Sequence, residues 1–293
     1  MMKWSGILVS SNIFFSFIFT TSKTIDVANT IVPSHRTPRY NIFSAFYFIK
    51  INFNFSTFHK PKPDDITYHK MVNVLSDGSG SIELLGCFGD DLTVVNAARV
   101  SFSKESKSLT EGDKKLIAYL AKHNHVSPFF HPQVRLRLKM PIFVVREWYR
   151  HTVGFARNEV SRRYVDTVPD CYVPEISSIR ERDTNLKQGS KSNPADSAEY
   201  AKECIEELTQ SALDTYDALL KANVAPEVAR MVLPQSMHTE FIETASLYAY
   251  ARLCKLRLSP DAQHEIRLYA EALSKILEKE FPVSWAALNT NYA

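Results

Sequence analysis

The stretch RHTVGFARNEVSRRY, residues 150–164, holds four arginines, one histidine and one carboxylate within fifteen positions. A guanidinium stays protonated at any working pH and grips phosphate or carboxylate through paired hydrogen bonds. Several guanidiniums on one site would therefore suit a phosphorylated, anionic substrate. A solvated surface patch can have the same composition, so these residues alone leave a surface patch and a phosphate site both open.

Two further arginines lie in apolar or helical surroundings, where a lysine would have served a merely solvated face. Arg230 stands in VARMVLP and Arg257 in LCKLRLSP, although apolar neighbours can also arise by chance. His151 is ambiguous because a histidine at a helix end can interact with the helix dipole without any catalytic role. Glu159 can simply pair with a neighbouring arginine. The residues therefore indicate a phosphate-binding enzyme and no particular reaction.

Known nucleotide-binding and nucleophile signatures are missing from the sequence. GSGSIE, residues 78–83, lacks the third glycine of a dinucleotide fingerprint, and neither a GxxxxGK[ST] loop nor a serine nucleophile elbow occurs. The cysteines show no CxxC spacing, which argues against a zinc site and favours reduced thiols in a reducing, cytoplasmic compartment. They are Cys87, Cys171, Cys204 and Cys254.

Composition limits the classes of partner. The 293 residues are 45% hydrophobic, enough for a sizeable core, and the formal net charge is only +3. Such a balance does not require nucleic acid or a membrane as a partner of the core domain. A nucleic-acid-binding module that uses the arginine stretch is an alternative, but acidic Glu147 and Glu159 interrupt that cluster.

Residues 1–70 differ from the rest of the chain. A lysine and an apolar run from Ile7 to about Thr20 resemble a signal peptide, but the run is short and serine-rich for a membrane span. Met71 opens a segment that is typical of an ordinary domain. We expect residues 1–70 to be a poorly ordered leader, or sequence upstream of the natural start, outside the core. An organelle-targeting segment and an integral domain are the alternatives.

Residues 71–293 are expected to form one compact α+β domain. Hydrophobic periodicity and helix-start signals predict its first elements in this order: a strand over 81–89, helices over 91–102 and 110–123, a half-buried strand over 133–141, a helix over 141–151 and an extended segment over 158–165. In that extended segment Glu159, Ser161 and Arg163 would share one face.

The second half of the domain is expected to be mostly helical. Residues 181–193 contain a single apolar residue and predict a mobile loop. Prolines then mark helix starts at Pro194, Pro226 and Pro260, and residues 236–257 are expected to be helical throughout.

Separated motifs in this order resemble the flavin-dependent thymidylate synthases, from about Met71 to the C-terminus. They are AARVSF (97–102), HVSPFFH (125–131), PIFVVREWYRH (141–151), RH…NEVSRRY (150–164), VARMVLP (228–234) and LRLSPDAQHEI (256–266). The resemblance implies a small antiparallel sheet packed with several long helices, unlike a Rossmann fold. It also implies methylation of dUMP to dTMP, with carbon from methylenetetrahydrofolate and hydride from FAD reduced by NADPH. A homotetramer with active sites between subunits, and no cysteine nucleophile, are implied as well.

The resemblance also implies roles for individual residues, none of them in metal binding. Arg257 would be catalytic, stabilising charge on the uracil ring as carbon 5 becomes nucleophilic. The dUMP would be bound, mostly through its phosphate, by Glu147, Arg150, Ser161, Arg162 (through its backbone), Arg163, Arg230 and Arg257. The FAD would be bound by His125, Ser127, Arg150, His151, Thr152, Val153, Glu159, Ser246, Leu247, Tyr248 and Arg252.

Several positions depart from the usual pattern of that family. The commonest signature has an arginine in place of Thr152, and the spacing from His151 to Asn158 is one residue longer than usual. Three other positions differ too: Ser246 and Arg252 replace asparagines, and Glu147 replaces a common glutamine. These changes concern FAD contacts more than the dUMP site. They leave open a catalytically altered relative that binds nucleotide or flavin without turnover.

Overall fold

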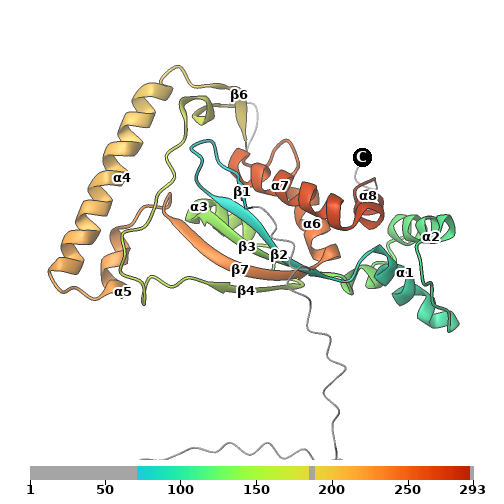
Figure 1. Cartoon of the computed structure of the whole chain (residues 1–293). Helices are drawn as coiled ribbons and strands as arrows, with labels where there is room; N and C mark the ends of the chain where they lie inside the picture. The colour runs from blue at the N-terminus through green and yellow to red at the C-terminus, as the bar shows by residue number, and fades with distance from the viewer. Residues whose placement is uncertain (1–70, 185–188, 291–293) are drawn as a thin grey trace, which may run out of the picture. The chain divides into compact units, whose positions relative to one another are not determined.

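A five-stranded antiparallel sheet is the base of the part of the chain that the structure describes (Figure 1). The structure is a computed structural model that describes residues 71–184 and 189–290, so the prediction for residues 1–70 lies outside it. The order of the strands across the sheet is β1-β2-β3-β7-β4. Their bounds are β1 Val72–Asn73, β2 Ser81–Phe88, β3 Gln133–Pro141, β4 Phe155–Glu159 and β7 His238–Ser246.

Strand β3 has the alternation expected for residues 133–141. Val134, Leu136 and Leu138 are fully buried, whereas Arg135 and Arg137 are exposed. Successive side chains of a strand point to opposite faces, so one face of β3 belongs to the core.

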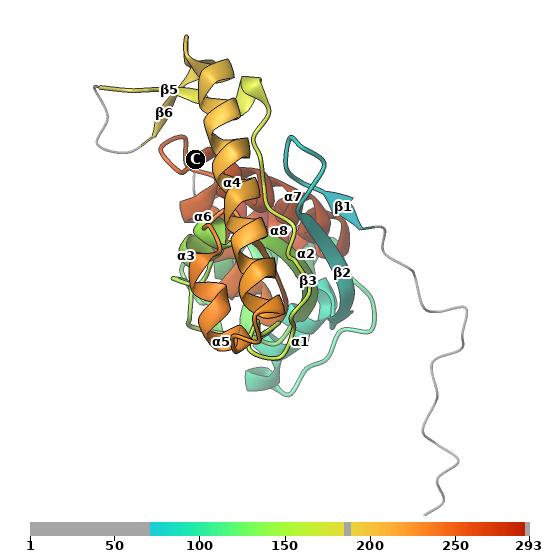
Figure 2. The ribbon, with the colours of Figure 1, turned by 90° about the vertical axis from the view of Figure 1, so that its left-hand side faces the viewer.

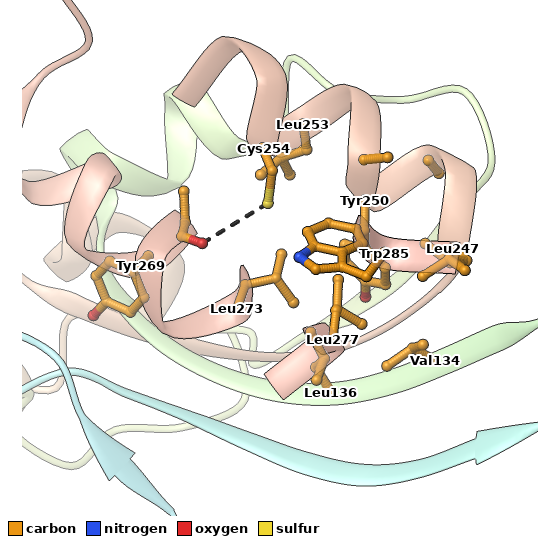
Figure 3. Close-up of a cluster of buried hydrophobic side chains, with 14 of the residues drawn as sticks. Val134, Leu136, Leu247, Tyr250, Leu253, Cys254, Tyr269, Leu273, Leu277 and Trp285 are labelled. Atoms are coloured by element: carbon orange, nitrogen blue, oxygen red, sulfur yellow. Dashed lines mark hydrogen bonds between the residues drawn. The ribbon is translucent and has the colours of Figure 1, made fainter. Parts of the chain in front are cut away.

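Three C-terminal helices cover that apolar face. They are α6 Leu247–Arg257, α7 His264–Glu280 and α8 Pro282–Thr290. Figure 3 shows leucine and aromatic side chains of these helices above Val134 and Leu136. Burying each large apolar side chain contributes about 1.5–3 kcal/mol to stability. Sγ of Cys254 in α6 lies 3.8 Å from the carbonyl oxygen of Ala270 in α7, which is a buried contact between the two helices. The expectation of an α+β fold with a small antiparallel sheet is confirmed.

Strand β7 occupies the first part of the segment expected to be helical over 236–257, so that expectation is wrong there. Phe241 and Glu243 are buried, whereas Glu240 and Ile242 are exposed, which is a period of two. An inward glutamate and an outward isoleucine conceal this period in the sequence. Helix α6 follows β7 directly, so the helical expectation holds only for the remainder of the segment.

The extended segment expected over 158–165 is also placed differently. Strand β4 ends at Glu159, and the chain then turns, with the Tyr164 N–H donating to the Ser161 carbonyl over 3.0 Å. Residues after Glu159 therefore do not alternate as a strand would. The expectation that Glu159, Ser161 and Arg163 share one strand face is wrong.

Helices α4 (Ala198–Lys221) and α5 (Pro226–Ala229) pack together, and Figure 2 shows them side by side. The helix start expected at Pro226 is confirmed. A short 3-10 turn, η6, continues α5 over Arg230–Val232. No helix among the described residues, α4 included, is long and apolar enough to cross a membrane.

A two-stranded hairpin precedes α4. Strand β5 (Arg180–Arg182) pairs with β6 (Ser190–Pro194), so the segment expected to be a loop over 181–193 contains strand residues. Residues 185–188, between the two strands, lie outside the described residues. Because Pro194 belongs to β6, helix α4 starts later than expected.

The helix expected from Pro260 also starts later, at His264. The N–H of Ala262 donates to the carbonyl of Ser259 over 2.9 Å, so this stretch is a turn. The C-terminal helical region is then divided in two, because Pro282 starts α8.

Helices α1 (Asp91–Arg99) and α2 (Glu111–Lys122) pack against α8. A capping box begins α2: the Thr110 hydroxyl accepts the Asp113 N–H, and the Asp113 carboxylate accepts the Thr110 N–H. A helix start leaves its first N–H groups without partners inside the helix.

Asp91 supplies hydrogen-bond acceptors to the first N–H groups of α8, although it lies near the opposite end of the domain in sequence. Its Oδ2 accepts the N–H of Val283 over 2.9 Å, and its Oδ1 accepts the N–H of Ser284 over 2.8 Å. The carboxylate is itself buried. One side chain therefore fixes the C-terminal helix against the helix that follows β2.

We expect Asp91→Ala to lower the free energy of unfolding by about 1–3 kcal/mol, because two N–H groups of α8 lose their acceptor. Urea denaturation of the full chain, followed by circular dichroism, measures this change. Glu111→Ala is the control, since it removes an exposed acid from the first turn of α2. Equal losses in the two variants would contradict the capping role of Asp91.

Candidate active site

The guanidinium of Arg257 is fixed by three hydrogen bonds at the C-terminal end of α6. Its Nη1 donates to Oε2 of Glu147 over 3.0 Å, and its Nη2 donates to the backbone carbonyl of Glu147 over 2.9 Å. Its Nε donates to Nε2 of His151 over 3.0 Å. Glu147 lies in helix α3 (Ile142–Trp148), and His151 follows that helix. The contacts therefore join the ends of α3 and α6 and orient the planar cation.

His151 is neutral in this arrangement. A guanidinium can only donate, so Nε2 of His151 accepts with its lone pair and the ring proton is on Nδ1. Burial, followed by the positive charge of Arg257, lowers the pKa of His151 to about 4. At neutral pH, His151 is therefore an uncharged acceptor that orients Arg257.

The carboxylate of Glu147 stabilises the protonated, positively charged form of Arg257. Burial lowers the pKa of the Arg257 guanidinium from its usual value, and the carboxylate of Glu147 opposes that change. The side chain of Arg257 is 16% exposed and remains a cation, since guanidiniums are not deprotonated in proteins. A fixed cation of this kind can stabilise negative charge that develops on a bound molecule, without proton exchange.

A cavity of about 570 Å³ opens beside this cluster, and we call it the Arg257 cavity. Its volume lies in the range of small-molecule sites. It brings together seven residues predicted from the sequence: Glu147, Arg150, His151, Thr152, Val153, Arg252 and Arg257. It also contains five that were not predicted: Phe155, Ala249, Leu256, Asp261 and Ala262.

A second cavity of about 470 Å³, the Arg163 cavity, collects another group of predicted residues. Its lining includes Glu159, Ser161, Arg162, Arg163 and Arg230. The Glu159 carboxylate is held from two sides: Tyr149 Oη donates to Oε2 over 3.1 Å, and Thr239 Oγ1 donates to Oε1 over 2.7 Å. The two cavities share no lining residue. The predicted residues are therefore divided into two groups in one copy of the chain.

A turn connects His151 to β4. The N–H of Phe155 donates to the carbonyl of Thr152 over 3.3 Å. Gly154 has a φ of +86°, and a Cβ there would lie 3.1 Å from the Cβ of Ala249 in α6. The positive φ and the close approach both favour glycine. The segment from His151 to Asn158, whose spacing is one residue longer than usual in the family that the motifs resemble, therefore consists of this turn and the first residues of β4.

Five predicted FAD-binding residues lie outside both cavities. They are His125, Ser127, Ser246, Leu247 and Tyr248. Ser246 is buried and caps α6, where its Oγ accepts the N–H of Ala249 over 3.2 Å. Leu247 is part of the apolar core. The side chains of Ser246 and Leu247 therefore stabilise the fold, by capping α6 and by packing in the core.

Sequence reasoning missed a buried charge in strand β7. Glu243 of β7 is fully buried and bonds to Trp148 and Arg157. The sequence signal for this charge was the spacing of two residues that separates Glu243 from Phe241 and from Ala245. That spacing places all three on the inward face of a strand, in a segment that was expected to be helical.

No cysteine lines either cavity. Burial raises the pKa of the Cys171 and Cys254 thiols. A thiol with a raised pKa is a poor nucleophile. All four cysteines are unpaired, and no group of acidic, histidine or cysteine residues within the described ranges could hold a metal ion.

Comparison with known proteins bears on the region that holds both cavities. The family model described as "Thymidylate synthase complementing protein" matches residues 83–283. A flavin-dependent thymidylate synthase of Thermus thermophilus is 40% identical over 208 residues, covering 71% of this chain and 75% of that protein. One of Kosmotoga olearia is 40% identical over 215 residues, covering 73% and 92%. A solved structure, the UMP/dUMP methylase PolB from Streptomyces cacaoi bound with 5-Br dUMP, has a TM-score of 0.65 at 30% identity, covering 72% of this chain and 95% of that one.

We expect the pKa of His151 to rise in Arg257→Ala, from about 4 towards but not to 6.5, because the charge is removed while burial remains. Histidine titration by two-dimensional NMR measures this value. Arg137→Ala, which removes an exposed arginine of β3, should leave the His151 titration unchanged. A His151 midpoint that does not move in Arg257→Ala would show that the two side chains are not in contact.

Proposed function

Because the chain belongs to the family of flavin-dependent thymidylate synthases, we propose that it methylates dUMP to dTMP. Methylenetetrahydrofolate supplies the carbon, and FAD reduced by NADPH supplies the hydride. The observation that carries the proposal is the cation of Arg257, fixed in the wall of a cavity with two further arginines. A reducing, cytoplasmic compartment suits the four unpaired cysteines.

Arg257 acts on the uracil ring. Its Nη1 and Nη2 each retain one N–H after bonding to Glu147, so two donors remain for a uracil oxygen. Negative charge grows on the ring as carbon 5 becomes nucleophilic, and a preoriented cation stabilises that charge in the transition state. Neutral His151 contributes by accepting from Nε and holding the guanidinium in one plane.

The Arg163 cavity binds the phosphate of dUMP. Arg162, Arg163 and Arg230 bring three positive charges to its lining, and Ser161 adds a hydroxyl. Guanidiniums bind phosphate oxygens through paired, charge-assisted hydrogen bonds. The guanidinium of Arg163 also lies over the ring of Tyr164, 5.1 Å from its centroid, a contact that limits its motion.

The Arg257 cavity suits FAD. Arg150 and Arg252 supply cations for the diphosphate, and no ion pair links either of them to a carboxylate in the described part of the chain. Phe155 adds apolar surface for a ring system. Arg252 compensates for the charge that is missing at Thr152, since both residues line this cavity. Arg150, Arg252 and Phe155 would hold the FAD here, and the reduced cofactor would supply hydride.

The active site is shared between copies of the chain. The uracil contact and the phosphate contacts belong to one nucleotide, yet Arg257 lines one cavity and Arg163 the other. A homotetramer resolves this division if the Arg257 cavity of one copy faces the Arg163 cavity of a neighbour.

The proposal is tested with the purified full chain. We expect a flavin absorption spectrum, NADPH oxidation, and release of tritium from carbon 5 of labelled dUMP when methylenetetrahydrofolate is present. Arg257→Ala should keep flavin and lose about 10²–10³-fold in turnover, because it removes the charge beside the uracil and leaves Arg150 and Arg252 in place. Arg137→Ala should match the wild type.

Two results would contradict this proposal in different ways. A wild-type protein without flavin, and without dUMP-dependent tritium release when FAD is added, would not be this enzyme. A wild-type protein that binds flavin and dUMP but never turns over would be the catalytically altered relative. Full turnover of Arg257→Ala would remove that residue from the mechanism.

We expect activity to return when two inactive variants, Arg257→Ala and Arg163→Ala, are co-expressed. Random mixing leaves about a quarter of shared sites with both arginines intact. Tritium release by the co-purified protein, compared with each variant alone, measures the recovery. Co-expression of Arg257→Ala with the double variant Arg163→Ala/Arg257→Ala is the control and should stay inactive. Absence of recovery in verified mixed oligomers would place the whole site within one copy.

A further inference from the structure

A buried ion pair joins strands β7 and β4 of the sheet. Glu243 of β7 is 0% exposed, and both oxygens of its carboxylate lie 3.2 Å from the indole nitrogen of Trp148. The same carboxylate pairs with Nε of Arg157, the residue directly opposite on β4. Burial raises the pKa of Glu243, and the charge of Arg157 opposes that rise. A buried carboxylate without such a partner would be strongly destabilising.

Stability alone does not account for this pair. Nη2 of Arg157 is buried and has no hydrogen-bond acceptor within the described residues, so part of its desolvation cost is not offset. Apolar side chains of similar volume are often as stable as a buried ion pair, or more stable. The orientation that the pair imposes on its neighbours is the better explanation for a charge in this position.

The guanidinium of Arg157 contacts two aromatic rings, and each ring leads to a different cavity. Its Cζ lies 4.9 Å from the ring centroid of Tyr149 and 4.5 Å from that of Phe155. Phe155 lines the Arg257 cavity. Tyr149 donates its hydroxyl over 3.1 Å to Glu159, which lines the Arg163 cavity. Cation–π contact with a desolvated guanidinium restrains both rings.

We propose that Arg157 is a positioning residue for both cavities: it fixes Phe155 beside the FAD site and, through Tyr149, Glu159 beside the dUMP site. The identity of the two ligands rests on the proposed function. Glu243 is the counter-ion that holds the guanidinium between the rings. Because a planar cation is needed to contact two rings, lysine is not equivalent to arginine here.

Two variants test this role without leaving a charge buried alone. Arg157→Lys keeps a counter-charge for Glu243 but loses the planar contact with the rings. The double variant Arg157→Met/Glu243→Gln removes both charges, and the glutamine oxygen can still accept from Trp148. Both variants should fold with melting temperatures near that of the wild type. In both, the FAD Kd from flavin fluorescence and the dUMP KM should each rise about tenfold, the effect of losing a desolvated cation–π contact.

Arg137→Met is the matched control for these variants. Arg137 is exposed on β3 of the same sheet and pairs at the surface with Glu83 and Glu240, over 3.4 and 3.6 Å. Its removal should leave both constants unchanged.

Several outcomes would overturn the positioning role. Melting temperatures that fall while both constants stay at wild-type values would make the pair structural only. Wild-type constants in Arg157→Lys would show that charge, not planarity, is what the site needs. A rise in one constant alone would break the link between the cavities. A wild-type protein that binds neither FAD nor dUMP would contradict the proposed function itself. A wild-type protein that binds both, with any of the results above in the variants, would contradict only the positioning role.

Discussion

The pairing of β7 with its two neighbours sets the geometry of both cavities. Strand β7 is hydrogen-bonded to β3 on one side and to β4 on the other, and it continues directly into α6. The pairing with β4 places Arg157 opposite Glu243 and Glu159 opposite Phe241. A slip of one residue would turn Glu243 to the other face of the sheet, so the buried charge and the strand register support each other.

Arginine serves two different purposes in this molecule, and the partner of each guanidinium decides which. Arg257 and Arg157 are held by carboxylates and aromatic or imidazole rings, so they are fixed charges within the protein. Arg150 and Arg252 line a cavity, and neither forms an ion pair within the described ranges. Their charges are therefore available to a bound anion. Fixed cations shape a site, whereas unpaired ones select its ligand.

The sequence predicts the helices and the central strand well where local signals are strong. The Thr110–Asp113 capping box and the strict alternation of β3 are examples, since each depends only on neighbouring residues. It fails for β7, because the inward Glu243 is stabilised by Arg157 and Trp148, which are distant in the sequence. No local pattern can show that such a glutamate will be buried.

The predicted site residues fare in a similar way. Motif resemblance selected most of the residues that line the two cavities, among them Arg257, His151 and Arg230. It could not show that His151 accepts from Arg257, because that contact depends on how α3 and α6 end beside each other. The division into two cavities, and the roles of Tyr149 and Arg157, also depend on packing between strands and are absent from any single motif.

The topology of the sheet has a consequence for how the chain folds as it is synthesised. Strand β3 ends at Pro141, but its partner β7 begins only at His238, and the helices that cover it come later still. Pairing over such a distance must meet a large loop-closure entropy, which makes the step slow. Until then β3 has an open edge and an uncovered apolar face, the features that promote aggregation of nascent chains. The apolar face of the sheet is therefore covered only after the C-terminal helices α6, α7 and α8 have been synthesised.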